Sequence, residues 1–182
     1  VAPPDGSPTE AAATITAREF FDQDVQRRIA AWKRGSAPLS VVLVEVDDFA
    51  NLARQYPRAG ELLQATITRF LQATLREMDH VARLDEHRYG VLLPTVNATF
   101  AGEVAERLRK DAGDVRLNVS EAEIRFTVST GAAEVMPDDD APCLLQRATT
   151  ALQTAIDRGR NRSYWHDGQR CLPVGIAPQT LV

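Results

Sequence analysis

The feature that most constrains the fold is a pair of apolar segments separated by four polar residues. The segments are 81–84 and 89–94, and both are rich in β-branched and aliphatic side chains, which is typical of strands. The second segment ends at a proline. Between them lie Asp85, Glu86, His87 and Arg88, where the chain has to reverse. The pattern therefore predicts a β-hairpin with its turn at 85–88.

Apolar periodicity along the rest of the chain predicts helices that alternate with strands. The run 39–46 is almost continuously apolar, as expected of a central strand buried on both faces. Apolar residues at spacings of three and four predict helices elsewhere. The expected helices cover 16–34, 59–77, 97–112 and 142–158, and Gly113 is expected to end the third of these. A further short helix, capped by Asp47 and Asp48, is expected to end at 56. The other expected strands cover 115–119, 124–135 and 163–166, the last as an edge strand.

This order of elements indicates an α+β fold, an α/β sandwich in which helices cover a mostly antiparallel central sheet of about five strands. The 182 residues suit one domain with short extensions. We expect the domain to occupy 13–168, after a flexible lead-in over 1–12 and before an irregular tail over 169–182. The first residue is Val rather than Met, and we interpret the chain as a fragment of a larger protein.

The composition argues against some partners. The formal net charge of −4 and the pI near 5.4 indicate no basic face for nucleic acid. No apolar run reaches the roughly 20 residues that a membrane span needs, so we expect no membrane contact from this segment. Cys143 and Cys171 lie far apart and lack metal-ligand spacing. They are expected to be free thiols, as in a cytoplasmic protein.

Five sequence blocks, in matching order and at matching separations, resemble the GGDEF family, the diguanylate cyclase domains of bacterial signalling. The blocks are 45–49, 75–84, 105–109, 126–133 and 151–162. The resemblance implies the nucleotide-cyclase-like fold of that family and a role in cyclic di-GMP signalling. Active members join two GTP molecules into cyclic di-GMP as dimers. The implied partners are therefore GTP, cyclic di-GMP, a second copy in a homodimer and other domains of the parent chain.

The family signature itself is altered in this chain. Members carry Gly-Gly-Asp/Glu-Glu-Phe where this chain has Asp85, Glu86, His87, Arg88 and Tyr89. Two family carboxylates hold Mg²⁺, and the resemblance assigns the first to Glu45 and the second to His87, a poor ligand for that cation. Arg88 adds a charge that repels the metal. We therefore expect an inactive catalytic site and no resident cofactor, with Mg²⁺ only where residual nucleotide binding persists.

Two alternatives stay open. In a shifted alignment Asp85 and Glu86 supply the acidic pair, which needs both an insertion and a deletion in the chain. The domain can also retain GTP binding or residual cyclase activity. If GTP binding persists, the resemblance assigns guanine recognition to Glu61 and phosphate binding to Arg160. The family's other two positions, an Asn that contacts the base and a Lys that contacts phosphate, are occupied here by Ala53 and Ile156.

A second ligand site is implied by the resemblance. Many members bind cyclic di-GMP at an inhibitory R-x-x-D motif, and Arg76 and Asp79 match it, with Arg107 at the position of a second arginine. A guanidinium can fork onto guanine O6 and N7, and a carboxylate can accept from the guanine N–H groups. The alternative is that these are solvated charges at a helix end. The resulting hypotheses are a regulatory or interaction module, a residual cyclase, and a purely structural domain.

Overall fold

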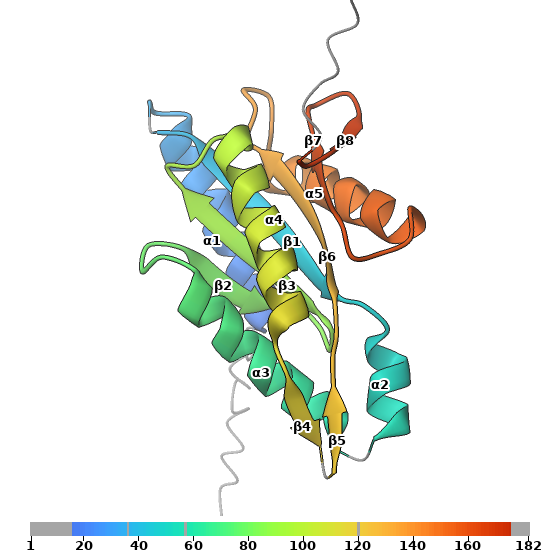
Figure 1. The fold of residues 1–182 in the computed structure, drawn as a ribbon. Helices are drawn as coiled ribbons and strands as arrows, with labels where there is room; N and C mark the ends of the chain where they lie inside the picture. Colours follow the sequence, from blue (N-terminus) through green and yellow to red (C-terminus); the bar gives the residue numbers. More distant parts are fainter. Residues whose placement is uncertain (1–15, 36, 57, 120, 176–182) are drawn as a thin grey trace, which may run out of the picture.

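The computed structural model describes residues 16–35, 37–56, 58–119 and 121–175, and the predicted lead-in over 1–12 lies outside them. Figure 1 shows one sheet with helices on both faces. The helices are α1 Ala17–Trp32, α2 Phe49–Gln55, α3 Ala59–Thr74, α4 Ala98–Asp114 and α5 Ala141–Asp157. The strands are β1 Leu39–Val46, β2 His80–Arg83, β3 Arg88–Pro94, β4 Leu117–Val119, β5 Ala122–Ile124, β6 Val128–Glu134, β7 Ser163–His166 and β8 Cys171–Pro173.

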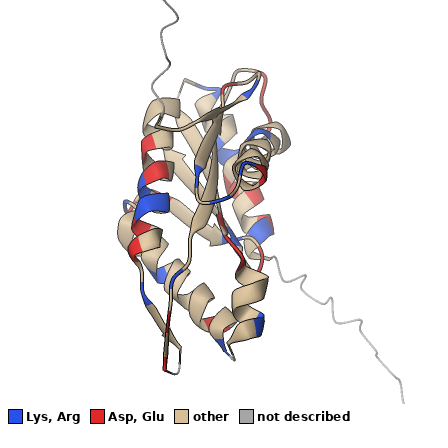
Figure 2. Ribbon diagram, turned by 45° about the vertical axis from the view of Figure 1, so that its right-hand side comes forward, with Lys and Arg blue, Asp and Glu red and all other residues tan. Residues whose placement is uncertain are grey.

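The large sheet has the strand order β2-β3-β1-β6-β7-β8, and only β6 and β7 run parallel. The predicted α+β sandwich with a mostly antiparallel sheet is thus confirmed. Alternate side chains of β1 enter two apolar clusters, one with α3 and α4 and the other with α1 and α5. This two-sided burial explains the almost continuous apolar run. Charged residues lie mainly on the helices and loops (Figure 2).

The number of strands was predicted too low because the segment 169–175 is not irregular. Within the described residues the large sheet has six strands, since β8 pairs with β7 and makes 163–166 an inner strand. The turn depends on Asp167, whose carboxylate accepts from the amides of Gln169 and Arg170. Gly168 adopts a positive φ of 102° in this turn. The dipeptide Asp-Gly at 167–168 is a hairpin signal that the sequence prediction missed.

The prediction of one strand over 124–135 was also wrong. The chain forms β5, which pairs only with β4 in a separate hairpin, and then β6 in the large sheet. Val128 lies opposite Val46, the last residue of β1, so residues 125–127 have no neighbouring strand to pair with. The break therefore follows from the length of β1, which ends where α2 begins.

Two helices end at residues other than those predicted. Helix α3 ends at Thr74 rather than 77, because Leu75 is extended and Asp79 accepts a hydrogen bond from the Arg76 amide, which forms a turn. Helix α4 continues through Gly113, where a Cβ would meet no atom within 4 Å. The N-terminus of α5 follows the prediction, with the Asp140 side chain accepting from the Cys143 amide.

The structure bears on two further predictions. Cys143 and Cys171 are free thiols, as predicted. Across the described ranges, the search for a helix both long and apolar enough to cross a bilayer finds none.

Candidate functional site

The altered signature lies where β1 and the β2–β3 hairpin meet at one end of the sheet. The register pairs Glu45 with Arg88, and the two side chains form an ion pair. The Arg88 Nη2 and Nε atoms donate to Glu45 Oε2 at 2.5 and 3.1 Å. Only 15% of the Glu45 side chain is exposed. The carboxylate that the resemblance assigns to a metal is therefore bound by a guanidinium through two charge-assisted hydrogen bonds.

The His87 ring lies beside the ion pair between Glu45 and Arg88. It stacks on Phe49 with ring centroids 5.9 Å apart, and its Nε2 lies 3.9 Å from Glu45 Oε2. Asp85 faces the turn instead, where one carboxylate oxygen accepts from the amides of His87 and Arg88. The Val46 amide donates to the His87 carbonyl, and Glu45 lies opposite Arg88.

These residues do not fit Mg²⁺. The ion prefers several oxygen ligands in an octahedral arrangement, whereas the group offers one carboxylate, an imidazole and a permanent cation. In the described part of the chain, no cluster of three or more His, Cys, Asp or Glu side chains is arranged to hold a metal.

Tyr89, the last residue of the altered signature, belongs to the core. It is completely buried, and its hydroxyl donates to the Gln64 carbonyl of α3. Burial raises the pKa of the Tyr89 hydroxyl. The Gln64 side chain donates to the Glu86 carbonyl and accepts from Arg83. Gln64 therefore fastens α3 to both ends of the hairpin turn, a role that no local sequence pattern predicted.

Asp47 organises the neighbouring loops and was predicted only as a strand-end or capping residue. It is 5% exposed and accepts hydrogen bonds from the Thr127 and Ser129 hydroxyls and from the Asn161 amide. The last of these bonds holds the loop that carries Arg160, in which Arg160 and Asn161 have φ of 62° and 47°. Asp48, by contrast, makes no side-chain capping bond to α2.

Replacement of Asp47 by alanine is expected to destabilise the fold by about 2–4 kcal/mol, because it leaves the buried Ser129 hydroxyl and the half-buried Thr127 hydroxyl without their acceptor. Urea unfolding followed by circular dichroism measures this loss. The control is Asp138→Ala, since Asp138 is exposed and its replacement should change stability by less than about 0.5 kcal/mol. Equal stability of the two variants would contradict the organising role of Asp47.

The residues assigned to nucleotide recognition lie on separate elements. Glu61 is exposed in the first turn of α3, beside a surface cavity of about 550 Å³ that Arg69 and Arg83 also line. Ala53 lies against α3, since a Cβ on Gly60 would come within 3.3 Å of the Ala53 Cβ. Arg160 is exposed, and no acidic side chain within the described ranges forms an ion pair with it.

The three residues of the predicted inhibitory site lie near the C-terminal end of α3. The Asp79 Oδ2 atom accepts from the Arg76 amide at 2.9 Å, whereas Asp79 Oδ1 is buried without a partner among the described residues. Arg107 Nη2 approaches the Thr74 carbonyl at 3.5 Å. The structure thus brings Arg107 of α4 close to the turn 75–79. A ligand would reach the buried Asp79 oxygen only if this turn moved.

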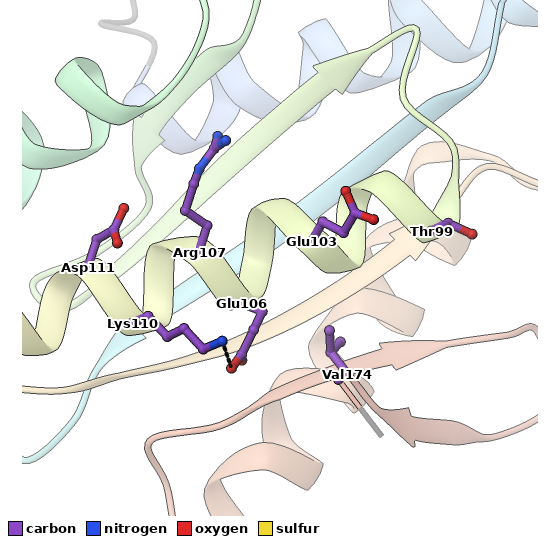
Figure 3. Close-up of a pocket in the computed structure, with 8 residues that line it drawn as sticks. Thr99, Glu103, Glu106, Arg107, Lys110, Asp111 and Val174 are labelled. Atoms are coloured by element: carbon purple, nitrogen blue, oxygen red, sulfur yellow. Dashed lines mark ion pairs between the residues drawn. The ribbon is translucent and has the colours of Figure 1, made fainter. Parts of the chain in front are cut away.

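Helix α4 also lines a surface cavity of about 540 Å³ together with Val174 and Gly175 (Figure 3). In Figure 3 the side chain of Arg107 points away from one side of α4, whereas those of Glu106 and Lys110 point away from the other side. Glu106 forms ion pairs with Arg109 and Lys110 at 2.7 and 3.7 Å. The hydrogen bond from Arg109 lowers the pKa of the Glu106 carboxyl. Arg109 in turn donates to the Asn161 side chain and so connects α4 to the Arg160 loop.

Comparisons with known proteins agree with this architecture. Diguanylate cyclase A of Treponema denticola is 29% identical over 126 residues, which cover 68% of this chain and 34% of that protein. Diguanylate cyclase DosC of Escherichia coli is 29% identical over 147 residues, which cover 80% of this chain and 32% of DosC. The chain thus spans about a third of the length of these curated relatives.

The fold is also that of a solved domain. The GGDEF domain of DgcB from Caulobacter crescentus, in complex with c-di-GMP, superimposes with a TM-score of 0.76 at 20% identity, covering 82% of this chain and 88% of that one. A family model described as "Diguanylate cyclase, GGDEF domain" matches residues 10–162. The match covers most of the chain and includes the altered hairpin. The chain therefore belongs to the GGDEF family.

Proposed function

We propose that this is a non-catalytic GGDEF domain that serves as a regulatory or interaction module in bacterial cyclic di-GMP signalling. The observation that carries the proposal is the ion pair between Arg88 and Glu45. A divalent cation at Glu45 would have to displace the guanidinium and then remain beside its positive charge. The side chains of Asp85 and Glu86 add negative charge where the family has glycines, which disfavours a polyanionic triphosphate.

The direct test is incubation with GTP and Mg²⁺ or Mn²⁺, followed by chromatography for cyclic di-GMP. Accumulation of the product would contradict the proposal and favour a residual cyclase. Calorimetric titration with GTP addresses the remaining alternative, a domain that binds GTP without converting it, for which Glu61 and Arg160 are the expected contacts.

A second candidate function is recognition of cyclic di-GMP at Arg76, Asp79 and Arg107. It is favoured by the position of Arg107 beside the turn that Arg76 and Asp79 form. The Asp79 oxygen that lacks a partner is an acceptor suited to a guanine N–H once the turn shifts. The DgcB domain, which has the same fold, was solved with c-di-GMP bound.

For this second candidate we expect calorimetry to detect cyclic di-GMP binding, and Arg76→Ala to weaken it at least about tenfold, because a bidentate contact to guanine is lost. Arg69→Ala is the matched control, since Arg69 is an exposed arginine of α3, outside the turn that carries Arg76. Absence of heat from the wild-type protein at about 100 μM ligand would end this candidate. Equal weakening by the two substitutions would indicate general charge attraction instead.

A further inference from the structure

Strand β2 forms one edge of the large sheet (Figure 1). The Leu84 amide donates to the Arg88 carbonyl, and opposite residues of an antiparallel pair alternate between hydrogen-bonded and non-hydrogen-bonded pairs. His80 and Ala82 therefore direct their main-chain groups to β3, and Val81 and Arg83 direct theirs outward. Among the described residues, none hydrogen-bonds to the outward amides or carbonyls of Val81 and Arg83. The edge is thus open to an added strand.

A groove runs beside this open edge. It has a volume of about 520 Å³ and lies between α1 and β2. Its apolar lining comes from Phe20, Phe21, Val81 and Ala82. Phe20 is 56% exposed, so its ring offers apolar surface to a partner at this edge. Because side chains alternate along a strand, a segment added to β2 would turn one apolar side chain toward this groove.

The surroundings of the groove carry positive charge on a chain whose net charge is −4. Arg27 lines it, and Arg28 lies at its border through a hydrogen bond to His80. The acid in its lining is Asp24, which is engaged by His80 at 3.1 Å and by Arg27 and Arg28 at 3.8 and 3.9 Å. Arg83 adds a positive charge to the same strand, with its guanidinium donating to the Gln64 side chain of α3. The outer edge of β2 is therefore flanked by more guanidinium groups than carboxylates.

Further charged residues lie around the edge of β2. Arg69 lines a neighbouring hollow with Arg83, and Arg18 lines another. Asp85 and Glu86 lie at the hairpin end of β2, beyond Arg83. Edge-to-edge pairing with a second copy of this chain would bring two arginine-rich edges together, which is electrostatically unfavourable. The charge pattern therefore favours an acidic partner over self-association.

We propose that the outer edge of β2 binds an extended, acidic segment of a partner protein as an additional strand. The outward main-chain groups of Val81 and Arg83 supply the pairing, and the arginines supply the charge complementarity. The α1–β2 groove takes one apolar side chain of that segment. Arg83 also lines the cavity beside Glu61, whereas the α1–β2 groove is lined by none of the residues assigned to nucleotide recognition. The inference does not depend on whether the domain is catalytic.

A fluorescein-labelled peptide of about ten residues that alternates Glu with Val serves as the probe, and the equivalent Lys–Val peptide serves as the reference. Fluorescence anisotropy is expected to show binding of the acidic peptide at micromolar concentrations, weaker by at least about tenfold in the double variant Arg27→Glu, Arg83→Glu. The matched control is Arg158→Glu, an exposed arginine at the end of α5, which should change affinity less than about twofold.

Amide hydrogen exchange measured by NMR distinguishes strand addition from simple charge attraction. Protection of the Val81 and Arg83 amides in the presence of the acidic peptide is the expected result. The proposal is overturned if the acidic peptide fails to bind at about 1 mM, if the lysine peptide binds equally well, or if binding leaves exchange at these two amides unchanged.

Discussion

Incubation of this protein with GTP and Mg²⁺ or Mn²⁺ is expected to yield cyclic di-GMP at least about 10⁴-fold more slowly than an active relative. On the roles that the resemblance assigns, His87 in place of a metal ligand, the cation at Arg88 and Ile156 at a phosphate-binding position would each remove transition-state stabilisation. Such losses amount to roughly 2–3 kcal/mol each, and 1.36 kcal/mol corresponds to a tenfold change in rate. Together they account for the expected drop of at least about 10⁴-fold.

Two variants separate the effect of the ion pair at Glu45 from the effect of the missing second metal ligand. Arg88→Ala breaks the ion pair and frees Glu45, yet leaves one carboxylate, so turnover should remain undetectable. The double variant His87→Glu, Arg88→Glu restores acidic side chains beside Glu45 and should bind Mn²⁺, which electron paramagnetic resonance detects as loss of the free-ion signal. Product from the wild-type protein at a rate within about 10⁴-fold of DosC, used as the positive control, would refute the inactive assignment.

The fold was largely predictable because the sequence of β1 shows that the strand is buried. A strand buried on both faces must be apolar at nearly every position, and residues 39–46 have this pattern. The same reasoning failed at 124–135, since the point where a strand stops depends on the length of its neighbour. It failed again at β8, which is only three residues long and half-buried and therefore lacks a strong apolar signal.

The resemblance assigned the candidate site to Glu45 and the hairpin 85–89, and that assignment stays a prediction. The contacts between these residues come from the structure alone. The two hydrogen bonds from Arg88 to one oxygen of Glu45 depend on the register of β1 against β3, which brings together residues 43 apart in the sequence. Asp47 was underestimated for a similar reason, because its three donors come from β6 and from distant loops.

Replacement of Gly131 by alanine is expected to destabilise the protein by about 3–5 kcal/mol, the largest effect we expect from a single methyl group. Gly131 lies in β6, opposite Leu43 of β1, and α5 packs directly over it. An added Cβ would come within 2.1 Å of the Leu152 amide nitrogen and 2.4 Å of the Ala148 carbonyl oxygen. These are main-chain atoms of one helix, so a side-chain rotation cannot relieve the clash.

Relief instead requires α5 to move away from the sheet, which would expose the cluster that it buries with α1 and β1. Urea unfolding followed by circular dichroism measures the effect. The matched control is Gly113→Ala, in which the same methyl group enters open space near the end of α4. There it should stabilise the protein by about 0.5–1 kcal/mol, because alanine favours the helical conformation. A loss below about 1 kcal/mol for Gly131→Ala would mean that α5 does not pack against β6 at this distance.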